Sequence, residues 1–245
     1  MVVGRRDSLY NRSSTTQIVD LLTQTRSCLN ITKYPIDVSY ATGAVVSGHP
    51  MICGGWIGSS TFSECFKYSK TSNNWTLLTT MSTKRTASAS VPLNGKLWVM
   101  GGTGEGRRHS SSEFVSSFGD VSQPGPALPS PRYGHCAVKL STGQVMLIGG
   151  LLEENLKSVI IFDPDTVTFD TSLPSLKYNR TYLGCAVFNS AMHDNREVVL
   201  AVGGWKQATA EVWDYTQPNT KWTESKYLFV LSDWLHSSSQ IICTS

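Results

Sequence analysis

Short apolar runs recur along the chain and are broken every few residues by Gly, Pro, Asn and Ser. Runs such as Ser88–Val91 and Lys96–Met100 are too short for typical helices. Short runs of this kind, separated by turn-forming residues, are typical of strands joined by hairpins. We find no apolar pattern of period 3.6 over a helical length, so the sequence predicts an all-β protein.

Gly-Gly pairs follow apolar runs at regular intervals. The pairs are Gly54-Gly55, Gly101-Gly102, Gly149-Gly150 and Gly203-Gly204, and their first glycines are 47, 48 and 54 residues apart. Val2-Val3-Gly4 is similar to a weaker fifth copy. Glycines at a strand end allow close approach of neighbouring backbones. The spacing indicates five repeats, approximately residues 1–46, 47–92, 93–140, 141–188 and 189–245.

Aromatic residues follow a second spacing. Three copies place an aromatic residue seven positions before another large aromatic, as Tyr68/Trp75, Phe162/Phe169 and Tyr215/Trp222. The remaining copies have Ser117 and Pro124, or Cys28, at such positions. One large aromatic per four-stranded unit can fill the wedge between adjacent twisted sheets. Radial stacking of such sheets is the propeller solution to exposed sheet edges.

The Gly-Gly pair, the aromatic and the Trp seven residues later, at a period near 50, resemble the kelch repeat. The resemblance covers almost the whole chain and implies a kelch-type β-propeller of about five four-stranded blades in a single domain, residues 1–245. Kelch rings usually have six or seven blades, which leaves two alternatives open. Either the segment after Trp222, with Tyr227–Leu231, closes a five-bladed ring, or the chain is a fragment of a larger ring.

Six cysteines are present without any C-x-x-C spacing, and the five histidines are scattered, so we expect no metal site. Cys53 and Cys65 lie on neighbouring strands of one predicted hairpin and could form a disulfide if their side chains face the same way. Cys136 and Cys185 occupy matching positions in adjacent copies. For this second pair we favour two free, buried thiols over a disulfide.

N-x-Ser/Thr sequons occur at Asn11, Asn30, Asn74 and Asn179, and these are candidate glycosylation sites. Runs such as Ile52–Gly55 resemble extracellular kelch domains of invertebrates, which favours an oxidising, secretory compartment over the cytoplasm. No signal peptide is visible at the start of the sequence, and a truncated chain would explain both this and the weak first copy.

Composition and motifs exclude several functions. Hydrophobic residues make up 40% of the chain, enough for a sizeable core, and no apolar run is long enough to span a membrane. A net charge of +3 is too small for nucleic-acid binding driven by a basic tail. The glycine-rich run Gly101–Gly106 ends a predicted strand, no helix follows it, and no catalytic motif is present. We therefore expect neither an enzyme nor a cofactor.

Basic and aromatic residues gather in the loops after the Gly pairs and in the loops between repeats, which kelch propellers can open onto one face. Arginine and aromatic side chains suit acidic groups and flat apolar anchors. The candidates are Trp56, Lys84, Arg85, Arg107, Arg108, His109, Arg132, Tyr133, Arg180, Tyr182, Trp205 and Lys206. Because Arg85, Arg132 and Arg180 recur in register, we favour bracing of adjacent blades over binding for these three.

The sequence thus predicts a non-catalytic interaction module that binds a protein or glycan partner, acidic in character, through this face. The alternative is an intracellular kelch adaptor that recruits substrates to a ubiquitin ligase or binds actin. No BTB-like helical region precedes the repeats, which speaks against the ligase version.

Overall fold

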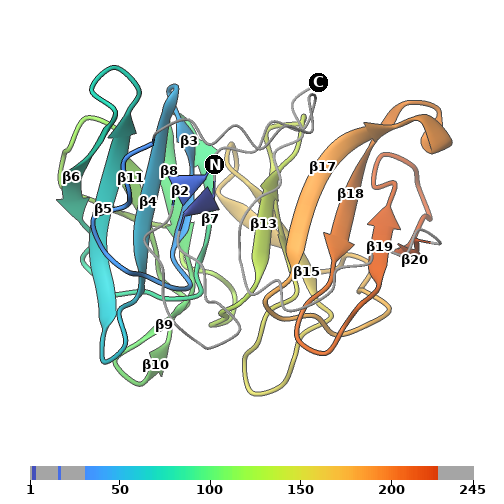
Figure 1. The fold of residues 1–245 in the computed structure, drawn as a ribbon. Helices are drawn as coiled ribbons and strands as arrows, with labels where there is room; N and C mark the ends of the chain where they lie inside the picture. Colours follow the sequence, from blue (N-terminus) through green and yellow to red (C-terminus); the bar gives the residue numbers. More distant parts are fainter. Residues whose placement is uncertain (1, 4–15, 18–30, 226–245) are drawn as a thin grey trace.

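The computed structural model describes residues 2–3, 16–17 and 31–225, and these residues are almost entirely in strands and turns (Figure 1). In this part of the chain, four antiparallel sheets of four strands each follow one another along the sequence. The helical segment within it is a single 3-10 turn, η1 (Ala191–His193).

Each of the four sheets, numbered I to IV, is an antiparallel meander. Sheet I contains β3 (Thr42–Val46), β4 (His49–Trp56), β5 (Thr61–Ser69) and β6 (Asn74–Thr80). Sheet II contains β7 (Ala89–Leu93), β8 (Lys96–Met100), β11 (Ser112–Ser116) and β12 (Gln123–Gly125). Sheet III contains β13 (Cys136–Lys139), β14 (Val145–Ile148), β15 (Val159–Asp163) and β16 (Thr168–Asp170). Sheet IV contains β17 (Gly184–Ser190), β18 (Arg196–Val202), β19 (Ala210–Trp213) and β20 (Thr223–Glu224).

Two short pairs complete the described strands. They are β1 (Val2–Val3) with β2 (Thr16–Gln17), and β9 (Thr103–Gly104) with β10 (Arg107–Arg108). Most of the first expected repeat lies outside the described residues.

The first strands of successive sheets, β3, β7, β13 and β17, contact one another in that order, so the sheets are arranged as propeller blades (Figure 1). The sheets are offset from the sequence repeats. Each sheet takes its first strand from the end of one repeat and its other three strands from the next. Each repeat therefore contributes strands to two successive sheets, so that neighbouring blades are linked through a shared repeat.

Four residues precede each first strand and form what we call the lead-in segments, residues 38–41, 85–88, 132–135 and 180–183. Their third residues, Tyr40, Ala87, Gly134 and Tyr182, all have positive φ, between 52° and 62°. The amide of Ala87 donates to the carbonyl of Tyr40, Gly134 donates to Ala87, and Tyr182 donates to Gly134, over 2.6–2.9 Å. A continuous chain of main-chain hydrogen bonds therefore links the four blades at their first strands.

The Gly pairs dock each sheet against the next lead-in segment. The second-glycine amides of sheets I, II and III donate to the carbonyls of Arg85, Arg132 and Arg180 respectively, over 2.7–2.8 Å. A Cβ on Gly101 would clash with the carbonyl oxygen of Arg132, and its φ is +63°. The repeated glycines are therefore required by the interface between blades.

The hydrophobic core consists of the layers between sheets. One layer joins sheets I and II around Met51, Val99 and Val115. The next joins sheets II and III around Trp98 and Phe162, and a third joins sheets III and IV around Met146 and Trp213. Burial of apolar area at these layers is the main driving force for stacking the blades.

In sheets I and III the seven-residue aromatic spacing corresponds to a pair of residues on neighbouring strands. Tyr68 lies opposite Trp75 and Phe162 opposite Phe169, with ring centroids 5.3 and 4.9 Å apart. In sheet IV the aromatic residue seven positions before Trp222, Tyr215, is not its partner across the strands. Trp213 packs against Trp222 at 5.7 Å, whereas Tyr215 is two residues further on.

The physical reason is the length of the turn between β19 and β20. Val212 pairs with Thr223, 11 residues later, whereas Ile161 of sheet III pairs with Asp170, 9 residues later. The turn in sheet IV is therefore two residues longer, which makes Trp213 and not Tyr215 the partner of Trp222.

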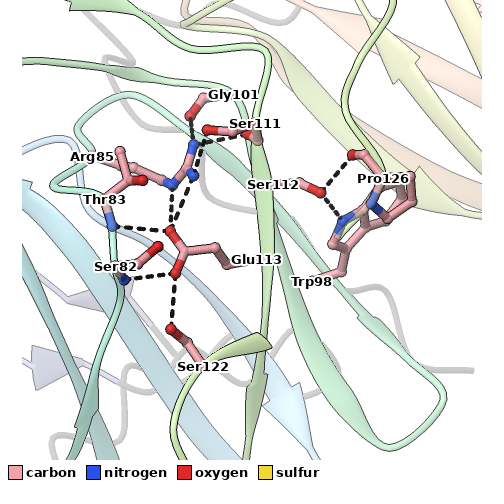
Figure 2. Close-up of polar contacts among 10 residues, drawn as sticks. All are labelled: Ser82, Thr83, Arg85, Trp98, Gly101, Ser111, Ser112, Glu113, Ser122 and Pro126. Atoms are coloured by element: carbon pink, nitrogen blue, oxygen red, sulfur yellow. Dashed lines mark hydrogen bonds and ion pairs between the residues drawn. The ribbon is translucent and has the colours of Figure 1, made fainter. Parts of the chain in front are cut away.

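Sheet II lacks the aromatic pair and is filled instead by Trp98. This side chain is fully buried, and its ring lies 4.7 Å from that of Phe162 in sheet III. Its indole Nε1 donates to Ser112 Oγ over 2.8 Å, and Ser112 Oγ donates to the carbonyl of Pro126 (Figure 2). Trp98 on β8, the second strand of sheet II, thus takes the packing role of the aromatic pair, in whose place the sequence has Ser117 and Pro124.

Two disulfides are present among the described residues. Cys53 and Cys65 lie opposite each other on β4 and β5 and are bonded, as the hairpin suggested. The expectation of free thiols at Cys136 and Cys185 was wrong. These residues join β13 to β17, with Cα atoms 6.0 Å apart, because adjacent first strands bring matching repeat positions together. Cys28 and Cys243 lie outside the described residues.

Candidate functional site

The two sets of loops that carry the basic and aromatic candidates meet at one end of the sheets. The residue after each Gly pair bonds to the second residue of its own sheet's lead-in segment. The amide of Thr103 donates to Thr86, Leu151 to Tyr133, and Trp205 to Thr181, over 2.7–2.9 Å. These bonds place the Gly-pair loops and the lead-in segments side by side.

A solvent-open groove of about 930 Å³ lies at this end, over sheets II, III and IV. Its lining consists of Thr103, Gly106, Arg107, Arg108, Pro131, Tyr133, Leu152 and Tyr182. Four of these, Arg107, Arg108, Tyr133 and Tyr182, are among the predicted binding residues. We call this feature the loop groove.

The loop groove carries positive charge. Arg107 and Arg108 form strand β10, are exposed, and make no ion pair with any carboxylate of the described residues. The neighbouring acidic residue, Glu105, already pairs with Lys84 at 3.3 Å. Two arginine side chains are therefore available for an acidic group.

Tyrosines form the aromatic part of the groove. The ring centroids of Tyr133 and Tyr182 lie 6.3 Å apart, and those of Tyr40 and Tyr182 lie 5.5 Å apart. Burial, with smaller contributions from Tyr133 and Tyr40, raises the pKa of Tyr182. At neutral pH its hydroxyl is protonated, as that of an unperturbed tyrosine also is.

Arg85, Arg132 and Arg180 are not part of this surface. All three side chains are at most 2% exposed, which corrects their inclusion among the binding candidates. Their carbonyls hold the Gly pair of the preceding sheet, and their guanidinium groups point into the sheet that follows. They recur in register because they brace the blades.

Two of these arginines form buried ion pairs. Arg85 contacts Glu113 Oε1 through Nε and Nη2 at 3.3 and 3.1 Å, and its Nη1 donates to the carbonyls of Gly101 and Ser111 (Figure 2). Arg180 contacts Glu211 Oε1 at 2.9 Å and bonds to Gly203 and Thr209 in the same way. Main-chain amides of Ser82 and Thr83 also donate to Glu113. The charges are thus fully compensated inside the protein.

The other candidates are dispersed. Lys84 is exposed beside the groove, and His109 is half-buried, where burial and the nearby Arg85 charge lower its pKa. Trp56 ends β4 in sheet I, whereas Trp205 and Lys206 are exposed on the Gly-pair loop of sheet IV. None of these side chains lines the groove.

The sequons Asn74 and Asn179 are both exposed, whereas Asn11 and Asn30 lie outside the described residues. Asn74 begins β6, and Asn179 directly precedes the buried Arg180. Their glycosylation remains a prediction.

Sequence reasoning missed Tyr40 and Leu152. Tyr40 was overlooked because Val38 stands where the other lead-in segments have Arg, which hid the first of them. Its position two residues before β3, with a positive φ, is the same as that of Tyr182 before β17. Leu152 follows a Gly pair, but the search there considered polar and aromatic residues alone.

Among the described residues, no group of three or more His, Cys, Asp or Glu side chains is arranged to hold a metal ion. Within the same residues, no helix is long and apolar enough to cross a membrane.

Known proteins support the kelch resemblance. The chain is similar to human Kelch-like protein 33, with 30% identity over 118 residues, which is 46% of this chain and 22% of that protein. It is also similar to the Rho GTPase-activating protein gacHH of Dictyostelium discoideum, with 26% identity over 130 residues, 46% of this chain and 8% of that protein. No protein-family model matches the sequence. The chain therefore spans less than a quarter of the length of either relative.

A solved structure agrees on the fold. The structure of YjhT matches with a TM-score of 0.65 at 16% identity, covering 79% of this chain and 66% of that one. With the Gly-pair repeats and the four-stranded blades, these likenesses make the fold a kelch-type β-propeller. The fold and the kelch-like relative support a role as a protein-interaction module.

Proposed function

We propose that the chain is a non-catalytic interaction module whose loop groove binds an acidic group of a protein or glycan partner. The single observation that carries this proposal is the placement of Arg107 and Arg108, exposed and without an ion pair among the described residues, beside Tyr133 and Tyr182 in one groove. The arginines would bind carboxylate, sulfate or phosphate oxygens, and the tyrosine rings would pack against a sugar or an apolar side chain.

The proposal is tested by screening the protein against arrays of secreted protein domains and of glycans. We expect hits to lose at least about tenfold in affinity in the Arg107→Ser/Arg108→Ser variant, since bonds to charged groups contribute about 1.5–3 kcal/mol each. The matched control is Lys96→Ser/Lys139→Ser, which removes the same charge from exposed residues at the far ends of β8 and β13. Equal binding by both double variants would refute the role of the groove.

We further propose that the module works in an oxidising compartment. Two disulfides among the described residues support this, because such bonds persist mainly in secreted proteins. The test is the intact mass and free-thiol count of protein expressed through a secretory pathway, before and after glycosidase treatment. We expect at most two free thiols among the six cysteines and a mass loss on glycosidase treatment. Six free thiols without glycan would favour the intracellular adaptor instead.

A further inference from the structure

Arg132 is the one buried lead-in arginine of the described residues that has no acidic partner. Its side chain is 2% exposed and forms no ion pair. Nη1 and Nη2 lie 3.4 Å from the Gly149 carbonyl and from Ser130 Oγ, whereas the Nη1 and Nη2 bonds of Arg85 and Arg180 to the Gly-pair carbonyl and to Ser111 or Thr209 measure 2.7–2.8 Å. Its Nε, the atom that contacts glutamate in the paired blades, has no partner.

The strand register shows what replaces the glutamate. Glu113 lies opposite Val99, and Glu211 lies opposite Ala201, in each case two residues before the first glycine of a pair. The equivalent residue of sheet III is Ile160, opposite Leu147. The guanidinium group of Arg132 therefore meets a hydrocarbon side chain at the position of its counter-ion.

The main chain before Arg132 also differs from that of the paired sheets. In the paired sheets the amide three residues before the arginine, that of Ser82 or Lys177, donates to the glutamate. The equivalent residue before Arg132 is Pro129, which has no N–H to donate. Loss of the carboxylate is thus accompanied by loss of a donor that served it.

Sheet I shows that the whole pair can be replaced. There the arginine position is Val38 and the glutamate position is Phe66, opposite Ile52, and both side chains are buried in one apolar cluster. An ion pair and a packed apolar pair are both acceptable in a protein interior, but an uncompensated buried charge costs several kcal/mol. Sheet III has the buried arginine, Arg132, but no glutamate to pair with it.

Other polar atoms near Arg132 also lack partners. Ser158 Oγ is buried without a hydrogen bond, although the equivalent Ser111 Oγ and Thr209 Oγ1 each accept from an arginine Nη2 at 2.8 Å. Both ring nitrogens of the fully buried His135 are unbonded as well. Buried polar groups without partners are rare in native proteins, and several beside one cation require an explanation such as a bound ion or water.

We propose that Arg132 and Ser158 bind a small inorganic anion of the halide class, chloride under ordinary conditions, which replaces the carboxylate of the paired blades. Arg132 Nε and the Ser158 hydroxyl would donate to it, and its charge would compensate the guanidinium group. A water molecule could accept the same hydrogen bonds but would leave the buried charge uncompensated. This site lies inside the blade and is independent of the proposed role of the loop groove.

The test is the Tm of the purified protein when sodium gluconate is replaced stepwise by sodium chloride or bromide at constant ionic strength. We expect the Tm to rise with the logarithm of halide concentration, because a ligand of the folded state stabilises it. Ile160→Glu supplies the carboxylate of the paired blades, and Arg132→Val copies the apolar version of sheet I. Both variants should lose the halide-dependent rise.

Controls separate this site from surface binding. The Arg107→Ser/Arg108→Ser variant keeps Arg132 and should retain the full halide response. Bromide-soaked crystals should show an anomalous peak within hydrogen-bond distance of Arg132 Nε. A Tm that does not respond to halide, a response that persists in Arg132→Val, or a peak on exposed arginines alone would each overturn the proposal. If Ile160→Glu does not fold, Arg132→Val still decides the outcome.

Discussion

The main-chain amide of Gly102 donates a hydrogen bond to the carbonyl oxygen of Arg132, 2.8 Å away, and thereby joins sheet II to the lead-in segment of sheet III. The same bond links Gly55 to Arg85 and Gly150 to Arg180. The Gly pairs and the buried arginines are therefore two halves of one interface. A change in either half should act on the packing of adjacent blades.

Gly101→Ala should strongly destabilise the protein. The new Cβ would clash with the Arg132 carbonyl, a main-chain atom that cannot move without shifting the next blade. The matched control is Gly95→Ala, which also has a positive φ, +72°, but nothing within 4 Å of the added Cβ. We expect Gly95→Ala to cost about 1 kcal/mol in the free energy of unfolding and Gly101→Ala at least about 3 kcal/mol, measured by urea denaturation. Equal losses would mean that the cost of Gly101→Ala comes from backbone strain and not from the clash at the interface.

The features that could be predicted from the sequence are those that every blade repeats at a fixed spacing. Glycines next to a neighbouring carbonyl tolerate no other residue, so Gly54-Gly55 and its copies were visible without a structure. A fixed spacing likewise identified Trp75 and Phe169, because each pairs with an aromatic residue on the neighbouring strand of its own sheet.

The features that could not be predicted depend on contacts between blades or on loop length. Trp98 replaces the missing aromatic pair from a different strand, and the longer β19–β20 turn of sheet IV pairs Trp222 with Trp213 and not with Tyr215. The disulfide from Cys136 to Cys185 depends on how closely β13 approaches β17. In the loop groove, the charged and aromatic residues were predicted, whereas Leu152 has no chemical signal that would distinguish it.

Glu113→Gln should cost about 3–5 kcal/mol of stability, because it leaves Arg85 buried without a counter-charge. The double variant Arg85→Val/Glu113→Phe copies Val38 and Phe66 of sheet I and should recover much of this loss. Urea denaturation of the three proteins at pH 7 measures both effects. If the double variant is no more stable than Glu113→Gln, the apolar version of sheet I does not transfer to sheet II.

The Arg85–Glu113 pair should lose its contribution to stability in acid. Burial alone would raise the pKa of Glu113, but hydrogen bonds from Ser82, Ser122 and Arg85 outweigh it and hold the pKa below 4.5. A carboxylate with a lowered folded pKa stabilises the protein above its unfolded pKa and loses this contribution as the pH falls through the folded value. The difference in stability between wild type and Glu113→Gln should therefore shrink below about pH 4.5. A difference that stays constant down to pH 3 would contradict the assignment.

His135 should impose a second pH dependence, at higher pH. Burial, with a smaller effect of the Arg132 charge, lowers its pKa to about 3. Between pH 6.5 and 3 the unfolded chain binds a proton that the folded protein does not, so stability falls by up to about 1.4 kcal/mol per pH unit. His135→Leu, which copies Leu183 of the next lead-in segment, should remove this term. Urea denaturation at pH 7.5, 6.5 and 5.5 should show the two curves diverging only below about pH 6.5, and parallel curves would exclude His135 as the cause.

The two disulfides should differ in their contribution to stability. Cys136–Cys185 closes a loop with a sequence separation of 49 residues, and Cys53–Cys65 one of 12. In the chain-entropy description the longer loop constrains the unfolded state more, by about 4 against about 3 kcal/mol. The longer bond also joins two blades, whereas the shorter one lies within sheet I. All four side chains are buried, so replacing each pair by alanine removes comparable packing and isolates the effect of the bond. We therefore expect Cys136→Ala/Cys185→Ala to lower the urea midpoint more than Cys53→Ala/Cys65→Ala, and the reverse order would show that the strain or packing of the hairpin bond outweighs loop closure.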